Sequence, residues 1–111
     1  MRESAYQARL IKKLRRLFPG CVILKNDPEY MQGVPDLIIL FGGRWACLEV
    51  KASAISSVQP NQDYWIEYLN NMWFAAFIYP QNEAEILDAL QQALKPVGDA
   101  RIPQREQLSL D

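Results

Sequence analysis

Hydrophobic residues recur at helical spacing in three parts of the chain. The pattern predicts helices over residues 4–18, 60–71 and 82–94. Pro60 suits the first turn of the second helix, where a missing N–H costs nothing. Ser4 followed by Gln7 predicts a capping box on the first helix, and Asn82 followed by Glu85 predicts the start of the third.

Apolar runs without helical spacing predict four strands, over residues 21–25, 36–41, 45–51 and 73–79. Gly42-Gly43 predicts a hairpin turn between the second and third strands, because paired glycines accept the positive φ angles of such turns. The last strand should pair in parallel with the third, across the second helix, in a right-handed crossover.

The order of elements is therefore α-β-β-β-α-β-α, which predicts an α/β fold with a mixed sheet flanked by helices. We expect one domain over residues 1–95, because the composition suits a single core and no repeat is visible. Residues 96–111 hold two prolines and little periodicity, which predicts an extended or disordered tail.

The hairpin register brings charged residues together. With Gly42 and Gly43 as the loop, Asp36 lies opposite Glu49, at a Cβ separation of roughly 4.5–5.5 Å, and Lys51 lies on the same face as Glu49. Facing carboxylates are destabilising without compensation, and Mg²⁺ needs only one or two carboxylates with water and phosphate. A surface salt-bridge cluster is the alternative, which the apolar strands disfavour.

These residues carry a resemblance. Pro35-Asp36 followed by Glu49-Val50-Lys51 resembles the core motif of the PD-(D/E)xK nuclease superfamily. The run from Gly33 to Ile38 resembles the virus-type replication-repair nuclease (VRR-Nuc) and Holliday-junction-resolvase-like branches of this superfamily. Over residues 3–95 the resemblance implies a three-layer, restriction-endonuclease-like domain.

The resemblance also implies an activity: a Mg²⁺-dependent DNA endonuclease, with Mn²⁺ as a substitute, acting on branched DNA in replication, recombination or repair. Asp36 and Glu49 would ligate the metal, the Val50 carbonyl could add a ligand, and Lys51 would orient the attacking water. The alternatives are a non-catalytic nucleic-acid-binding or assembly protein with the nuclease fold, and a structural protein with a chance motif.

Two more residues could support this site. Glu3, on the side of the first helix that carries Leu10, matches an acidic metal ligand of the resembled families; a dipole-favoured acid at a helix start is the alternative. Gln62 is polar on an otherwise apolar helix face, and the resemblance gives a glutamine of this helix a supporting role. Gln59 is its rival, and a helix cap or surface amide is the alternative for Gln62.

Charge is unevenly distributed, although the net charge is −1. Residues 1–51 hold nine Lys/Arg against five Asp/Glu, and residues 52–111 hold three against eight. One side of the first helix carries a basic stripe without interleaved acids, formed by Arg9, Lys12, Lys13 and Arg16. The stripe could contact DNA phosphates, as could Lys25, or it could be a solvated face.

Other chemistry is limited. The absence of histidine excludes histidine acid–base catalysis and most zinc sites. Cys21 and Cys47 fall in predicted strands, which favours buried free thiols. No apolar run approaches the roughly 20 residues of a membrane span, and no signal-peptide pattern opens the chain, so a cytoplasmic location is expected.

Two partners besides DNA are suggested. Exposed aromatic residues such as Trp73, Phe74 or Tyr68 could form a homodimer contact, or they could belong to the core. The segment Gln107–Asp111 resembles the peptide by which bacterial replication and repair proteins dock on the sliding clamp, although Asp111 stands where an aromatic residue is usual. The alternative is a tail without a clamp role.

Overall fold

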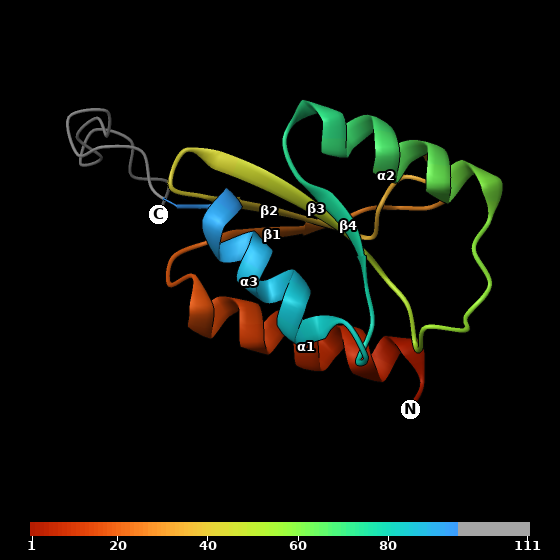
Figure 1. Cartoon of the computed structure of the whole chain (residues 1–111), viewed down its shortest axis with the longest axis horizontal. Coiled ribbons are helices and arrows are strands. Elements are labelled where there is room, and N and C mark those ends of the chain that lie inside the picture. Colours follow the sequence, from red (N-terminus) through yellow and green to blue (C-terminus); the bar gives the residue numbers. More distant parts are fainter. Residues whose placement is uncertain (96–111) are drawn as a thin grey trace.

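The computed structural model describes residues 1–95 and confirms the predicted α-β-β-β-α-β-α order (Figure 1). Its elements are α1 (Glu3–Leu17), β1 (Val22–Lys25), β2 (Leu37–Phe41), β3 (Arg44–Val50), α2 (Pro60–Met72), β4 (Ala75–Ile78) and α3 (Glu83–Ala93). None of the helices within this range is long and apolar enough to cross a membrane.

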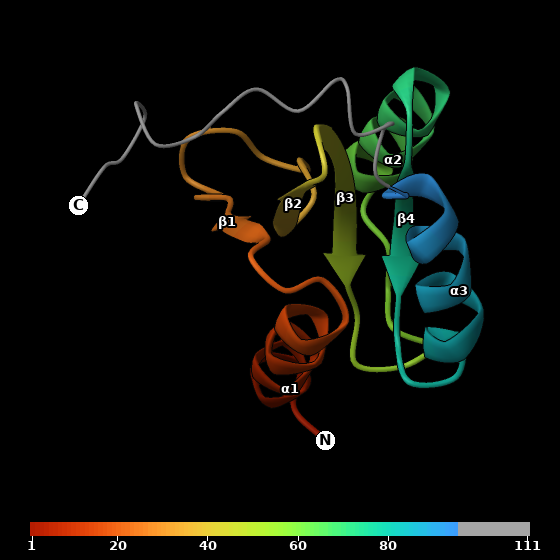
Figure 2. The same cartoon turned by 90° about the vertical axis from the view of Figure 1, so that its left-hand side faces the viewer.

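One mixed sheet forms the centre of the fold. Its four strands lie in the order β1-β2-β3-β4, as Figure 2 shows. The first three are antiparallel neighbours, whereas β3 and β4 run parallel and are connected through α2, as predicted. A parallel pair needs such a crossover because a short turn can join only antiparallel strands.

The helices cover both faces of the sheet. α2 lies on one side, and α1 and α3 lie on the other (Figure 1). The main core lies on the α1 and α3 side, where fully buried Leu10, Leu14 and Leu90 pack with Ile39 and Leu48 of the sheet. No residue of α2 is fully buried, so the α2 side holds room for polar chemistry.

The hairpin between β2 and β3 has the predicted register. Gly42 and Gly43 adopt positive φ angles of 62° and 80°, which side chains with a Cβ rarely accept. Phe41 pairs with Arg44, and the ladder continues to the pair of Leu37 and Leu48. One step further along the chain, Asp36 faces Glu49.

Asn82 stands at the predicted start of α3, but the side-chain capping bonds predicted for α1 and α3 do not form. α1 begins at Glu3, its N-cap is Arg2, and no side-chain cap bond forms, so Ser4 does not cap it. Asn82 is the N-cap of α3, and its backbone carbonyl accepts from the Ile86 N–H, but its side chain makes no capping bond to that helix. Its amide instead accepts from the Tyr79 N–H at 2.9 Å and donates to the Phe77 carbonyl at 3.1 Å, which closes the turn after β4.

Strand ends also differ slightly from the prediction. β2 begins after Asp36, and β3 ends before Lys51, so both charged residues lie just beyond regular strand. The predicted strand over residues 73–79 shortens to Ala75–Ile78, because the Trp73 N–H still donates to Leu69 at the end of α2.

Free Cys47 is buried and free Cys21 is half-buried. Burial raises the pKa of Cys47 to about 11 and so makes its thiol inert.

Candidate functional site

Asp36 and Glu49 form the acidic part of the site, at the end of the β2–β3 hairpin. Asp36 is fixed from two sides: its Oδ2 accepts from the Val50 N–H at 2.9 Å, and its backbone carbonyl accepts from the Asn26 N–H at 2.8 Å. Glu49 points to the α2 side of β3 and is only 3% exposed. Carboxylates are seldom buried so deeply without a charged partner.

The electrostatics of Glu49 reflect this crowding. Burial, followed by the negative charge of Asp36, raises the pKa of Glu49 to about 8, while Lys51 acts in the opposite direction. Glu3 contributes a smaller upward effect on the same pKa. The charge of Lys51 therefore does not offset the combined effect of burial and of the Asp36 charge on the ionised form of Glu49.

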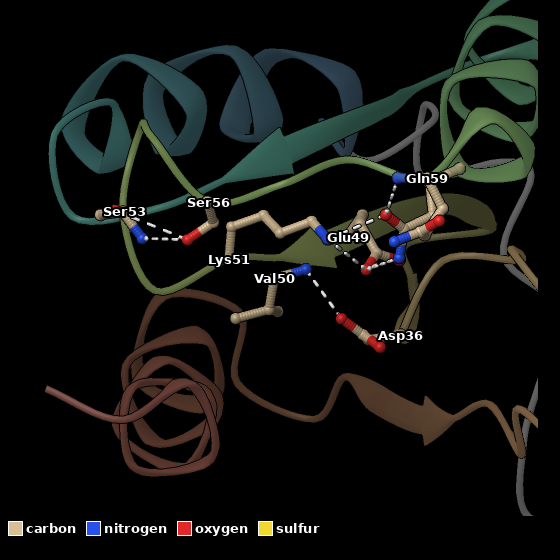
Figure 3. Close-up of polar contacts among 8 residues, drawn as sticks. Asp36, Glu49, Val50, Lys51, Ser53, Ser56 and Gln59 are labelled. Atoms are coloured by element: carbon tan, nitrogen blue, oxygen red, sulfur yellow. Dashed lines mark hydrogen bonds and ion pairs between the residues drawn. The ribbon is translucent and has the colours of Figure 1, made fainter.

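Lys51 lies beside Glu49 (Figure 3), and Gln62 of α2 completes the polar cluster. The Lys51 ammonium is buried with the rest of its side chain, 2.8 Å from Oε1 of Gln62 and 3.9 Å from Oε2 of Glu49. The amide nitrogen of Gln62 donates to the same Glu49 oxygen at 2.9 Å. Gln62 thus bonds to both the Glu49 carboxyl group and the Lys51 ammonium.

Gln62 also takes part in the cap of α2, which was the alternative predicted for it. Its Oε1 accepts from the Gln59 N–H at 3.0 Å, and the Gln59 side chain accepts from the Gln62 backbone in return. This reciprocal arrangement is a capping box. Gln59 belongs to the cap, and Gln62 alone reaches Glu49 and Lys51.

A glycine fixes the loop that precedes Asp36 against the start of α2. Gly33 has a φ of +85°, and a Cβ at this position would lie 2.3 Å from the Cβ of Asn61. Any larger residue would push the loop away from α2. The loop that places Asp36 is therefore positioned by the same helix that supplies Gln62.

Glu3 and Val50 are the two other predicted metal ligands. Glu3 is exposed at the start of α1, and within residues 1–95 no three His, Cys, Asp or Glu side chains gather around one possible metal position. Val50 contributes its amide to Asp36, and a role for its carbonyl stays a prediction. The structure thus brings together Asp36, Glu49, Lys51 and Gln62.

Two carboxylates suffice for one class of ion. Mg²⁺ is commonly bound through one or two protein carboxylates, with water and substrate phosphate completing its octahedron. Asp36 and Glu49 offer hard oxygen ligands, and the raised pKa of Glu49 means that Lys51 alone does not stabilise its ionised form, which is the form that a cation would bind. The residues present therefore fit a divalent cation.

The basic stripe of α1 is less free than its sequence predicts. The four residues of the stripe line a hollow of about 160 Å³ together with Glu83 of α3. These four are Arg9, Lys12, Lys13 and Arg16. Glu83 of α3 pairs with Lys13 and accepts from the Tyr6 hydroxyl at 2.7 Å. Burial alone would raise the pKa of Glu83, but the hydrogen bonds from Lys13 and Tyr6 bring it below its usual value. Helix spacing could not reveal this acid, because it comes from another element.

The remaining predicted contacts are dispersed. Lys25 is exposed at the end of β1. Trp73 is engaged within the chain, because its indole N–H donates to the Ala93 carbonyl at 2.9 Å and Arg44 lies 4.5 Å from its ring. Phe74 packs against the core, whereas Tyr68 is half exposed and stacks on Tyr64. The segment Gln107–Asp111 lies outside the described residues.

No family model, curated protein or solved structure matches this chain.

Proposed function

We propose that this protein is a metal-dependent nuclease of the PD-(D/E)xK type that hydrolyses phosphodiester bonds in DNA. The observation that carries the proposal is the convergence of Asp36 and Glu49 beside the buried Lys51. Gln62 bonds to Glu49 and Lys51, and the Val50 N–H holds Asp36. This is the set of groups that the sequence motif predicts, held in one place by contacts from two strands and a helix.

Each residue has a role that its contacts support. Asp36 and Glu49 would hold the ion, and Gln62 would keep Glu49 and Lys51 at a fixed separation. When bound, Mg²⁺ would supply Lewis-acid polarisation of the phosphate and neutralise charge on the leaving oxygen. Val50 orients Asp36 through its backbone amide.

Lys51 is suited to handle the attacking water. An ammonium has three donors, and within residues 1–95 one of them bonds to Gln62 Oε1 at 2.8 Å. The others can hold the water and the negative charge that grows on the phosphate oxygens during attack. The water oxygen would bond to phosphorus, and the phosphorus–oxygen bond to the leaving sugar would break. One proton of the water would pass to solvent, and the leaving oxygen would take up a proton from solvent.

The direct test is cleavage of end-labelled DNA by the purified chain, with a panel of duplex, nicked, flapped and four-way junction substrates. We expect products with Mg²⁺ or Mn²⁺ and none with a chelator, and Asp36→Asn should remove the cleavage. A gel shift without products would favour the non-catalytic binding protein. Neither shift nor products would leave the motif without a nucleic-acid role.

The exposed part of the basic stripe should supply salt-dependent affinity. Replacing Arg9, Lys12 and Arg16 together with glutamine should weaken DNA binding and lower the log–log salt slope, by about 0.9 for each lost phosphate contact. Fluorescence anisotropy over a range of salt concentrations measures this slope. Lys13→Gln is the matched comparison, because Lys13 is already paired with Glu83 and should change the slope least. An unchanged slope in the triple variant would make the stripe a solvated face.

A further inference from the structure

A second hollow, of about 420 Å³, adjoins the site at Lys51. Its walls come from the loop over residues 52–59, from β4 and the turn after it, and from the first turns of α2 and α3. Lys51 lines this hollow and also contacts Gln62 and Glu49. A group bound there would therefore lie next to the residue that we expect to face the scissile phosphate.

The walls of this hollow are mainly apolar and aromatic. Phe77, Tyr79 and Ile86 line it on one side, and Val58 lies on the loop side. Asn82 holds the backbone at both aromatic residues through its bonds to the Tyr79 N–H and the Phe77 carbonyl. Pockets with rigid apolar walls and few polar groups suit small planar ligands.

Asp63 of α2 is the one carboxylate on the wall. An acceptor of this kind can receive a hydrogen bond from the amino group of a base, as carboxylates do with cytosine. Phe77 and Tyr79 also line the hollow, and aromatic side chains are the groups on which any base can stack. The lining thus combines the two contacts by which proteins hold a single nucleobase.

The rim of the hollow presents an apolar side chain to solvent. The Ser56 N–H donates to the Ser53 carbonyl, and the Ser53 N–H donates to the Ser56 hydroxyl, both at 3.1 Å. The Ala54 N–H donates to Gln81 at 3.2 Å, which ties this turn to the start of the α3 region. Ile55 stands at the tip of the turn and is 93% exposed. Ile55 is not part of the lining, but its neighbours Ala54 and Ser56 are. Exposed apolar side chains of DNA-binding proteins can insert between neighbouring bases.

We infer that this hollow binds one unpaired nucleobase beside the scissile phosphate and is the site by which the protein distinguishes an unpaired from a paired strand. The inference rests on the proposed function and specifies its substrate. A base in an intact duplex can enter such a hollow only after it has left its pair and its stack, whereas an unpaired base carries no such cost. Discrimination therefore arises from the state of the strand rather than from its sequence.

Binding measured by fluorescence anisotropy tests this inference, with Asp36→Asn in every protein so that the DNA stays intact. The probes are one labelled single-stranded oligonucleotide and its duplex, in Mg²⁺. Tyr79→Leu should weaken single-strand binding about tenfold, as expected for the loss of one base–aromatic contact, and change duplex binding less than twofold. Tyr68→Leu is the matched control, because Tyr68 is a half-exposed tyrosine of α2 that does not line the hollow.

A second variant protects the test against misfolding of Tyr79→Leu. Val58→Trp fills the hollow from a rim position that is already 41% exposed, so it should fold normally and cause the same selective loss. A 2-aminopurine placed at successive positions of the single strand should change its emission at one position only, and this change should vanish in Val58→Trp. If Tyr79→Leu fails to melt cooperatively, Val58→Trp decides alone.

The outcomes separate the two proposals. The inference is overturned if a folded Tyr79→Leu or Val58→Trp protein loses affinity equally for single strand and duplex, or loses none. The nuclease proposal still stands in that case if the wild-type chain cleaves DNA. Selective loss of single-strand binding without cleavage by the wild-type chain keeps the base-binding hollow and removes the nuclease proposal.

Discussion

Lys51→Ala is expected to lower the rate of DNA cleavage by about 10²–10⁴, the range found when a positioned proton-transfer or charge-stabilising group is removed. Lys51 is the cation of the site, 2.8 Å from Gln62 and 3.9 Å from Glu49. Its loss removes the donors proposed for the water and the phosphate. Single-turnover cleavage with saturating protein and saturating Mg²⁺ measures the rate of the chemical step separately from the binding of DNA.

The matched control for this variant is Lys95→Ala, since Lys95 is an exposed lysine beyond α3 that no part of the site contacts. We expect Lys95→Ala to cleave at the wild-type rate. Anisotropy should show that Lys51→Ala still binds DNA within a few-fold of wild type, which places the loss in the chemical step. A cleavage rate near wild type in Lys51→Ala would refute the role of this residue.

The stability of the metal-free protein is expected to fall as the pH rises from about 5 to about 8. The pKa of Glu49 rises from 4.5 in the free side chain to about 8 in the fold. Across this window the folded state keeps a proton that the unfolded chain has released, so each pH unit costs about 1.4 kcal/mol at most. Urea unfolding in chelator at several pH values gives the slope.

Glu49→Gln is the matched variant for this measurement. It removes the ionisation but keeps the shape and a hydrogen-bonding amide, so its stability should change much less between pH 5 and 8 and exceed that of wild type at the upper end. Other perturbed groups act elsewhere: the stability linked to Glu83 is lost below its usual pKa, and Cys47 ionises near 11. Parallel slopes for wild type and Glu49→Gln would contradict the assignment.

Added Mg²⁺ should reverse this trend, because the ion binds the ionised carboxylates and competes with the proton. The gain in stability should follow RT ln(1 + [Mg²⁺]/Kd) and be larger at pH 8 than at pH 6. Neither Asp36→Asn nor Glu49→Gln should show the full gain. The same titration in a pH indicator should report proton release from wild type only.

The hairpin could be predicted from sequence because its determinants are local. Gly42-Gly43 fixes the turn, and once the turn is fixed, alternation places Asp36 opposite Glu49 and Lys51 on the same face. Gln62 could be singled out for a similar reason, since a polar residue on an apolar helix face requires a partner. The identity of that partner needed the fold, because α2 reaches β3 only through the crossover.

Contacts between distant elements could not be predicted in this way. Glu83 meets Lys13 and Tyr6 across 70 and 77 positions of sequence, and it changes the charge of a stripe that looks purely basic on its own helix. The hollow beside Lys51 is assembled from a loop, a strand and two helix starts, none of which has a distinctive pattern. Ser4 failed as a cap because Glu3 already belongs to the helix.

The bonding of Gln62 limits which substitutions the site can accept. Its amide donates to Glu49 and accepts from both Lys51 and the backbone of Gln59. Glutamate at this position would lose the donor and add a third negative charge, and lysine or arginine would lose the acceptor. Replacing Glu49 with a residue that cannot accept would leave the amide nitrogen of Gln62 without its acceptor. Replacing Lys51 with a residue that cannot donate would leave the amide oxygen of Gln62 without this donor. Glu49, Lys51 and Gln62 are therefore expected to change together in related sequences. A site with a different catalytic chemistry would need coordinated replacements at all three positions.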